Sequence, residues 1–276
     1  AVKKSDVIYF CVGTPYGNSG EADLTHLNEA FEEVLIDYEA DIYRVFVIKS
    51  TVPPNTLNKF IKPLIKNKGY QIGKNIGLAN NPEFLREGYA WSDFINADRV
   101  VIGVDDVISG EILTALYSNL KAPLFLSNTI TAEFTKYLSN SLLSVLISYA
   151  NEMRNFADYF GDIDVNKAFK IIHLDKRWNT GQMKSYFFPG VGFGGYCLPK
   201  DVSALFSIAK DNNIDSPILE KTILTNNQMP QTVVKKVLQQ TKNMSKDKIS
   251  LGILGLSFKK NTDDVRDSMS AKVIRI

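Results

Sequence analysis

The sequence predicts an α/β protein built around a parallel sheet, and three features support this prediction. Short apolar runs without polar alternation recur through the first 104 residues, and such runs suit strands that are buried on both faces. Segments with a helical period lie between these runs, and this alternation is typical of parallel α/β sheets. Polar residues, glycine or proline follow the runs, at the strand ends where such sheets bind their ligands.

Each expected element of this sheet has its own signal. The apolar runs predict strands at 7–12, 45–48, 76–79 and 100–104. Apolar residues at three- and four-residue spacing predict the intervening helices at 24–38, 55–68 and 109–120. Thr14, Thr51 and the Asn81-Pro82 pair come directly after the first three strands. We therefore expect them at the ligand-binding edge of the sheet.

The longest expected helix covers 131–160 and carries one apolar stripe. The stripe consists of Phe134, Leu138, Leu142, Val145, Tyr149, Met153, Phe156 and Phe160. Its length suits a spine between domains or an element through which two copies of the chain pair. Lys136 and Asn140 lie off the stripe on another face. An ammonium and an amide there could hold a developing oxyanion, and a solvated surface is the alternative.

The remaining pattern predicts helices at 165–172, 202–210 and 218–240, a polar linker at 243–248 and a strand at 249–255. The domains expected from this pattern are the remainder of a first α/β domain at 1–128, a helical dimerisation domain at 129–243, and the start of a second α/β domain at 248–276. The chain opens without Met, and it stops within a helical pattern. We therefore expect it to be a piece of a longer protein.

Composition excludes several classes of function. The chain has 276 residues and a net charge of +2, so no basic excess indicates a nucleic-acid partner. No apolar run approaches the roughly 18 residues of a membrane span, and no signal peptide opens the chain. With only Cys11 and Cys197, a reducing, cytoplasmic setting is expected. His26 and His173 stand in no metal-ligand spacing, so no metal is predicted.

The segment 192–201, with the sequence GFGGYCLPKD, is the strongest candidate for chemistry. Its glycines allow backbone to approach a ligand closely. A helix beginning near Pro199 would place Cys197 just before its positive end, and the nearby Lys200 would further favour a thiolate nucleophile. Asp201 could orient a water molecule or take a proton. The alternative is a buried structural cysteine.

The segment 81–88, with the sequence NPEFLREG, forms a second candidate. Asn81 can cap a short helical turn, Pro82 suits its first position and Gly88 can end it. Glu83 and Glu87 would then share a face and could do acid–base work. A solvated helical face is again the alternative.

Six segments together resemble the UDP-glucose and GDP-mannose dehydrogenase family of nucleotide-sugar dehydrogenases. They are CVGTP at 11–15, KSTVPP at 49–54, NPEFLREG at 81–88, EFTKYLSN at 133–140, GFGGYCLPKD at 192–201 and GLSFKKNTDDVRDS at 255–268. They occur in the family's order and span nearly the whole chain. The resemblance implies a Rossmann-like NAD-binding domain whose first βαβ unit, with its G-x-G-x-x-G turn, is missing from this sequence. It also implies dimerisation through the long central helix.

The resemblance implies a four-electron oxidation of a sugar primary alcohol to a carboxylate with NAD as the cofactor. Cys197 would form a thiohemiacetal and then a thioester. Lys136 and Asn140 would steady the oxyanion, Asp201 would hold a water molecule, and Glu87 would assist hydrolysis with Thr14 nearby. The implied cofactor contacts are Thr14, Thr51, Glu87, Lys200 and Arg266. Besides Lys136 and Asn140, the implied substrate contacts are Glu83, Phe84, Leu85, Arg86, Arg177, Tyr186, Phe187, Gly190, Gly194, Phe258 and Lys259.

Tyr196, the Lys200-Asp201 pair and the segment ADRVVIG at 97–103 resemble the UDP-glucose branch of the family, and GDP-mannose is the alternative substrate. Two rival hypotheses remain. A hydroxyacid or 6-phosphogluconate type of dehydrogenase shares the plan of a sheet and a long helix but needs no cysteine nucleophile. A non-catalytic core that only dimerises would need no complete NAD-binding turn.

Overall fold

The computed structural model divides into two compact units, Ala1–Leu138 and Ser139–Ile276, each of which is considered by itself. The division falls within the long helix α5. The residues that the structure describes are 2–17, 19–36, 38–39, 42–175, 185–242 and 250–276.

The first unit is built on a five-stranded sheet in the order β1-β2-β3-β4-β5. The strands are β1 (Val7–Phe10), β2 (Arg44–Ile48), β3 (Ile76–Asn80), β4 (Val100–Val104) and β5 (Leu124–Ser127). Neighbouring strands are parallel except for β3 and β4, which pair antiparallel. The prediction of an α/β fold with a largely parallel sheet is confirmed.

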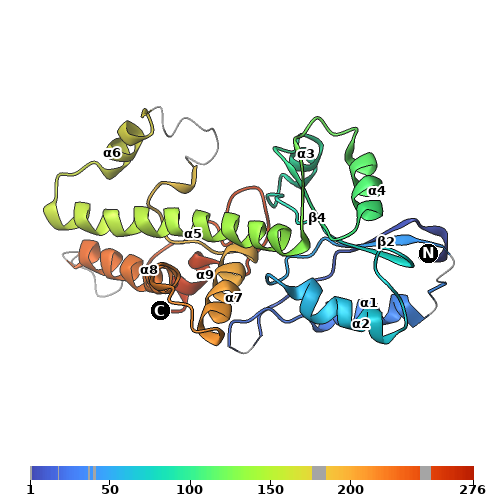
Figure 1. The fold of residues 1–276 in the computed structure, drawn as a ribbon. Helices are drawn as coiled ribbons and strands as arrows, with labels where there is room; N and C mark the ends of the chain where they lie inside the picture. The colour runs from blue at the N-terminus through green and yellow to red at the C-terminus, as the bar shows by residue number, and fades with distance from the viewer. Residues whose placement is uncertain (1, 18, 37, 40–41, 176–184, 243–249) are drawn as a thin grey trace. The chain divides into compact units, whose positions relative to one another are not determined.

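Helices cover both faces of this sheet (Figure 1). They are α1 (Thr25–Ile36), the π-helical segment η2 (Leu57–Ile61), α2 (Lys62–Asn67), α3 (Ala90–Ile95) and α4 (Val107–Tyr117), and a short 3₁₀ turn η1 (Val2–Lys4) precedes β1. Side chains alternate along each strand, so Phe46 and Ile48 pack against α1, η2 and α2. Val45 and Val47 face α4 on the other side. This two-sided burial is why the strands are continuous apolar runs.

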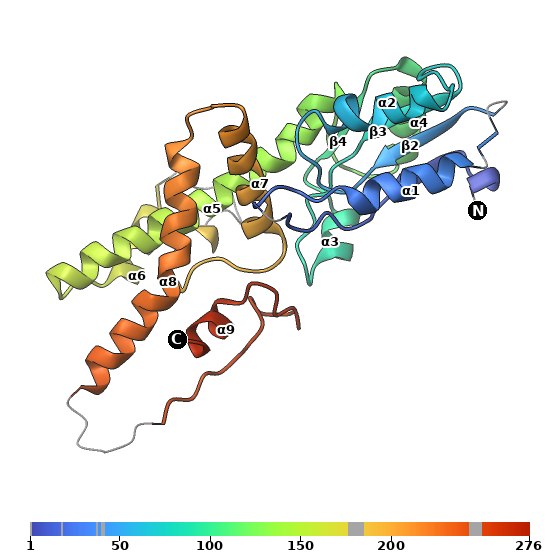
Figure 2. The same cartoon turned by 90° about the horizontal axis from the view of Figure 1, so that it is seen from below.

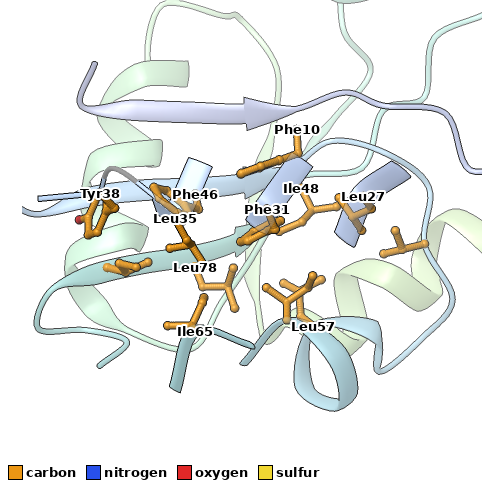
Figure 3. Close-up of a cluster of buried hydrophobic side chains, with 13 residues drawn as sticks. Phe10, Leu27, Phe31, Leu35, Tyr38, Phe46, Ile48, Leu57, Ile65 and Leu78 are labelled. Carbon is orange, nitrogen blue, oxygen red and sulfur yellow. The ribbon is translucent and has the colours of Figure 1, made fainter. Parts of the chain in front are cut away.

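Aromatic packing closes the first face of the sheet, as Figure 3 shows. The Phe10 and Phe31 rings stack at 4.0 Å between centroids, and Phe46 meets both rings at tilted or edge-on angles. All three rings are buried, and full burial of such a side chain contributes roughly 1.5–3 kcal/mol. This packed layer fixes the sheet whose strand ends carry the predicted ligand loops.

Three local predictions in this unit are corrected by the structure. The helix expected at 55–68 begins at Leu57 and opens with the π-helical segment η2. The predicted strands omit β5, a short edge strand whose central residues Phe125 and Leu126 are exposed. The segment 81–86 is irregular rather than helical, because the Asn81 side chain bonds to the Val101 carbonyl instead of capping a turn.

The second unit is helical over most of the residues that the structure describes there. It contains α5 (Thr129–Phe160) from Ser139 onward, α6 (Val165–Ile172), α7 (Cys197–Asp211), α8 (Pro217–Thr241) and the short α9 (Met269–Ile274). Figure 2 shows α7 and α8 side by side. Phe169 and Phe187 pack with Ala150 of α5 in an apolar cluster. The predicted 165–172 helix is confirmed, and those expected at 202–210 and 218–240 are longer than predicted.

The strand expected at 249–255 does not form over its described residues, 250–255. Leu251 and Leu254 are strongly exposed, the second at 99%. Strand propensity expresses packing and pairing with neighbours, and the described part of this unit supplies no adjacent strand. The apolar pattern alone was therefore insufficient.

The long helix α5 buries many polar side chains and exposes much of its apolar stripe. The buried polar side chains are Glu133, Lys136, Asn140, Ser141, Ser144, Ser148 and Asn151. On the apolar stripe, Phe134, Leu138, Leu142, Tyr149 and Phe156 are each at least 44% exposed. A solvated surface, the alternative for Lys136 and Asn140, is therefore wrong. Among the described residues, no helix is both long and apolar enough to cross a membrane.

Candidate active site

In the first unit, the loops that follow β1 and β2 are joined by a threonine. Thr14 is 3% exposed, and its hydroxyl donates to the Thr51 carbonyl oxygen over 2.9 Å. Ser50 of the second loop also donates to the Val12 carbonyl, at 2.6 Å. The predicted pair Thr14 and Thr51 therefore lies together at the carboxyl edge of the sheet, where α/β proteins bind ligands.

The loop after β3 brings a carboxylate to the long helix. Glu83 Oε1 accepts from Lys136 Nζ at 3.1 Å, and its other oxygen accepts from the Leu85 backbone N–H at 2.5 Å. The Lys136 side chain is 5% exposed and that of Glu83 is 26% exposed. The structure thus joins two predicted site residues that lie 53 positions apart. The partly exposed carboxylate is accessible to a polar ligand beside a buried cation.

The other residues of the 83–88 segment are held around this ion pair. The Phe84 ring lies 4.0 Å from the Arg99 guanidinium carbon and 5.5 Å from Lys136 Nζ. Arg86 binds Asp93 of α3 through two nitrogens, at 2.9 and 2.6 Å. Glu87 is half-buried in the turn that follows. Glu83 and Glu87 therefore do not share the helical face that the sequence predicted.

A half-buried lysine that the sequence analysis did not single out contacts the start of this loop. Lys49 Nζ donates to Asn81 Oδ1 at 2.8 Å, and the Tyr117 hydroxyl donates to the same oxygen at 2.5 Å. Burial lowers the pKa of Lys49 to about 8, although the negative charges of Glu83 and Cys11 act in the opposite direction. Lys49 and Asn81 together fix the start of the loop that carries Glu83.

Lys49 gives a pH-dependence of stability with a definite sign. Because its pKa is lower in the folded chain than in the unfolded one, unfolding takes up a proton between about pH 8 and 10.5, and stability rises with pH across that window. We expect Lys49→Met to remove this rise, with its largest stabilising effect relative to wild type below pH 8. Urea midpoints at pH 7.5 and 9.5 test this, with the exposed Lys59→Met as control. Parallel shifts at both pH values would contradict it.

In the second unit, the cysteine predicted to be the nucleophile opens a helix. Cys197 is the first residue of α7, two positions earlier than the helix start expected near Pro199. Proline is tolerated there because N–H groups in the first turn have no intrahelical partner. The Cys197 side chain is exposed, which contradicts the alternative of a buried structural cysteine. Its position at the positive end of a helix favours a thiolate.

One turn into the same helix lies a buried cluster of charged and polar groups. Asp201 is 1% exposed and accepts from Lys200 Nζ at 2.5 Å and from Asn140 Nδ2 of α5 at 2.6 Å. Lys200 is 2% exposed. The structure thus joins three predicted site residues, and it orients the Asn140 amide through a carboxylate. Lys200 and Asp201 follow Cys197 by three and four residues, whereas Asn140 comes from a distant part of the chain.

The glycine loop before Cys197 packs against the segment 258–267. A side chain at Gly194 would collide with the Asp267 carbonyl oxygen. A Cβ at Gly195, whose φ is +80°, would lie 2.7 Å from the Phe258 ring. The Gly195 N–H also donates to the Arg266 carbonyl at 3.0 Å. Two motifs separated by about sixty residues are therefore in contact, and glycine is required for it.

The Tyr196 ring stands between two cations predicted to contact the cofactor. The Arg266 guanidinium carbon lies 4.5 Å from its centroid and Lys200 Nζ lies 5.6 Å from it. The Arg266 side chain is 58% exposed and pairs with Asp264 at 2.7 Å. An exposed guanidinium suits a phosphate ligand. Lys259 also lies by an aromatic ring, 5.4 Å from the centre of Phe258.

The predicted substrate segment 186–190 contains both buried and exposed residues. Phe187 is buried and stacks on Tyr149 at 5.7 Å, whereas Gly190 is exposed. The Gly190 N–H donates to Asn151 Oδ1 of α5 at 2.7 Å. Arg177 lies outside the described residues. Within the described part of the chain, no cluster of His, Cys, Asp or Glu has the arrangement of a metal site.

The sequence analysis missed the amides that hold these loops. Asn226 of α8 accepts from the Phe193 N–H at 2.8 Å and donates to the Phe193 carbonyl at 3.0 Å. Both bonds go to one backbone residue of the glycine loop. The sequence signal for this role was a polar residue within a predicted helix. In the structure that residue, Asn226, is 5% exposed. No local spacing indicates which loop such an amide meets.

Comparison with protein families agrees with the motifs that these loops carry. Residues 1–121 match the NAD binding domain of the UDP-glucose/GDP-mannose dehydrogenase family, and residues 130–228 match its central domain. The chain belongs to this family. The first match covers strands β1 to β4 and the loops after β1, β2 and β3. The second covers Lys136, Asn140, Cys197 and Asp201.

Individual relatives extend the similarity over nearly the whole chain. A UDP-glucose 6-dehydrogenase of Rickettsia bellii is 42% identical over 99% of this chain and 61% of its own length. A GDP-mannose 6-dehydrogenase of Pseudomonas syringae is 34% identical over 97% of this chain and 60% of its own. A UDP-glucose dehydrogenase structure from Pyrobaculum islandicum matches with a TM-score of 0.89 and 35% identity, over 100% of this chain and 62% of its own. The chain thus spans about 60% of the length of these relatives.

Proposed function

We propose that the protein oxidises the primary alcohol of a nucleotide sugar to a carboxylate in two steps, with Cys197 as the nucleophile. The observation that carries this proposal is the exposed thiol at the start of α7, followed within one turn by the buried Lys200–Asp201–Asn140 cluster. A thiol, a fixed amide and a buried carboxylate are what covalent capture of an aldehyde and subsequent hydrolysis require.

The proposed reaction removes two hydrides and two protons from the sugar alcohol and adds one water molecule. Removal of a hydride and a proton converts the alcohol to an aldehyde, and the Cys197 thiol adds to it as a thiohemiacetal. Removal of a second hydride and of the hydroxyl proton gives a thioester, and water then releases the carboxylate and the thiol. When bound, NAD⁺ would supply the acceptor for each of the two hydrides. The ammonium of Lys136 and the amide of Asn140 stabilise the oxyanion of the additions, and Asp201 and Glu87 act on the hydrolytic water.

The residues that would hold NAD fit a dinucleotide in two respects. Thr14 and Thr51 lie together at the carboxyl edge of the sheet, the usual position for such a ligand. Arg266 presents an exposed guanidinium, which suits a pyrophosphate. We assign Thr14, Thr51, Glu87, Lys200 and Arg266 to the cofactor. The thiol chemistry would need the reducing conditions of the cytoplasm.

We propose UDP-glucose as the sugar, held by the 83–86 segment and by Lys259 with Phe258. The 42% identical relative is named for this substrate, and the GDP-mannose enzyme is the alternative. The test incubates the full-length protein with NAD⁺ and either UDP-glucose or GDP-mannose and follows NADH absorbance. Faster NADH formation with UDP-glucose is expected. A preference for GDP-mannose would overturn the substrate, and no NADH with either would overturn the reaction.

We also propose that two copies of the chain pair through the exposed stripe of α5. Aromatic and leucine side chains along one helix are exposed there, and such a surface is typical of an interface. We expect Phe156→Arg, which places a charge on the stripe, to convert a dimer to a monomer in light scattering. Phe60→Arg, at a similarly exposed phenylalanine of η2, should leave the mass unchanged. A monomeric wild type, or a dimer that survives Phe156→Arg, would contradict the proposal.

A further inference from the structure

The acid Glu133 is almost wholly buried in the first unit and has no role in the reaction above. It lies near the start of α5, three residues before Lys136, and is 1% exposed. Its Oε2 accepts from the Asn55 backbone N–H at 2.5 Å and its Oε1 from the Leu57 N–H at 2.9 Å. A buried carboxylate that engages two backbone donors 76–78 positions away is a long-range tie between two chain segments.

Glu133 holds the segment 49–56, which we call the Thr51 loop. It contains Pro53 and Pro54, which have no N–H to donate. Asn55 has a φ of +75°, in the left-handed region that costs a non-glycine residue about 1 kcal/mol or more. The N–H groups of Asn55 and Leu57 lie at the start of the helical segment that opens with η2, where they have no intrahelical partner. Glu133 supplies the missing acceptors through its two carboxyl oxygens.

The Thr51 loop and the start of α5, which Glu133 connects, carry different residues of the proposed site. The loop carries Thr51, whose carbonyl binds Thr14. The same face of α5 carries Lys136, which binds Glu83. A second polar link joins α2 to the start of α5. Asp105 accepts from Lys62 of α2 at 2.6 Å and from Thr129 of α5 at 3.0 Å. We propose that Glu133 is a positioning residue that fixes the Thr51 loop relative to the turn of α5 carrying Lys136. This inference rests on the proposed function.

The charge of Glu133 makes the tie sensitive to pH. Burial raises its pKa to about 7, although its bonds to Leu57 and Asn55 act in the opposite direction. The charged groups around it are Asp105, which raises the pKa further, and Lys62, which is paired with Asp105. When the loop opens, the carboxyl regains its ordinary pKa, so opening releases a proton. The closed loop is therefore favoured at low pH and weakened as pH rises toward 7.

The test compares wild type, Glu133→Gln and the control Glu152→Gln in the full-length protein. Glu152 is an exposed glutamate on the same helix. Amide hydrogen exchange of segment 50–61 should lose protection by about tenfold or more in Glu133→Gln and not in the control, since one acceptor oxygen becomes an amide NH₂. NAD⁺ affinity, measured by fluorescence quenching, should fall by about tenfold in the same variant.

The pH dependence of amide exchange provides a second test. After correction for intrinsic exchange, protection of segment 50–61 should fall by about tenfold or more between pH 5 and pH 8 in wild type. It should change much less in Glu133→Gln. Unchanged protection in Glu133→Gln, or a pH-independent loop in wild type, would overturn the proposal.

The remaining outcomes separate this inference from the proposed function. Lost protection with unchanged NAD⁺ affinity and unchanged KM values would mean that Glu133 only stabilises the fold, and would overturn the positioning role. Normal turnover in both wild type and Glu133→Gln would overturn the inference but leave the function standing. A wild-type protein that neither binds NAD⁺ nor oxidises a sugar would overturn both.

Discussion

Replacing Cys197 by serine is expected to lower the rate of carboxylate formation from UDP-glucose by at least about a thousandfold. A serine hydroxyl at neutral pH is a far weaker nucleophile than a thiolate at the start of a helix. In the proposed reaction, the second oxidation and the hydrolysis both need a covalent sulfur intermediate. The measurement is the formation of UDP-glucuronate, followed by chromatography, in the full-length protein.

The chain supplies its own control for this experiment. Cys11 is the other thiol, and its pKa is raised by desolvation, an effect that the positive charge of Lys49 only partly offsets. Cys11→Ser is therefore expected to retain the activity of wild type. Full activity in Cys197→Ser would remove Cys197 from the chemistry and favour a dehydrogenase that needs no nucleophile. Equal losses in both variants would indicate a structural effect of either substitution.

Replacing Asp201 by alanine is expected to destabilise the second unit by about 3–5 kcal/mol. The change takes the carboxylate away from Lys200, which is 2% exposed, and from the Asn140 amide. A buried ammonium that loses its carboxylate has no means of recovering its hydration within the fold. Urea unfolding monitored by circular dichroism measures the loss.

Asp211→Ala, at the other end of α7, is the matched control, because Asp211 is exposed. It should change the free energy of unfolding by no more than about 0.5 kcal/mol. The double variant Asp201→Ala with Lys200→Met should recover part of the stability, since it removes the buried charge as well as its partner. A loss below 1 kcal/mol in Asp201→Ala would show that Lys200 does not depend on this carboxylate.

The elements that the sequence predicted well are those with a local signal. The strand 100–104 matches its observed bounds and 45–48 differs by one residue, because strands buried on both faces must be apolar throughout. The helix 165–172 matches its observed bounds, with Asp164 accepting from the Lys167 N–H at its start. A cap of this kind is visible in the sequence alone.

The elements that failed depend on partners far away in the sequence. Segment 81–86 has the residues of a capped turn, but Asn81 is used instead by Lys49, Tyr117 and Val101. The strand expected at 249–255 has the composition of a strand without a neighbour to pair with among the described residues. A local sequence pattern shows neither that the Asn81 side chain is bonded elsewhere nor that a strand has no neighbour to pair with.

The predictions about the site also succeeded where the signal was local and failed where it depended on distant residues. The cysteine loop and its helix were evident from glycine, proline and the following Lys-Asp pair. The burial of Lys136 and Asn140 was not, because their partners Glu83 and Asp201 lie 53 and 61 positions away. On a helix whose apolar stripe is exposed, amphipathicity indicates the wrong face for the interior. Charged residues on the opposite face of such a helix are the signal to look for.

The most direct test of the proposed chemistry is the number of NADH molecules formed per UDP-glucose consumed. The full-length protein is incubated with excess NAD⁺ and a limiting, measured amount of UDP-glucose until the reaction is complete. Two NADH per sugar, with UDP-glucuronate as the product, is the predicted result. One NADH per sugar, with an aldehyde as the product, would contradict the account, because the reaction would then end before the step for which Cys197 is needed.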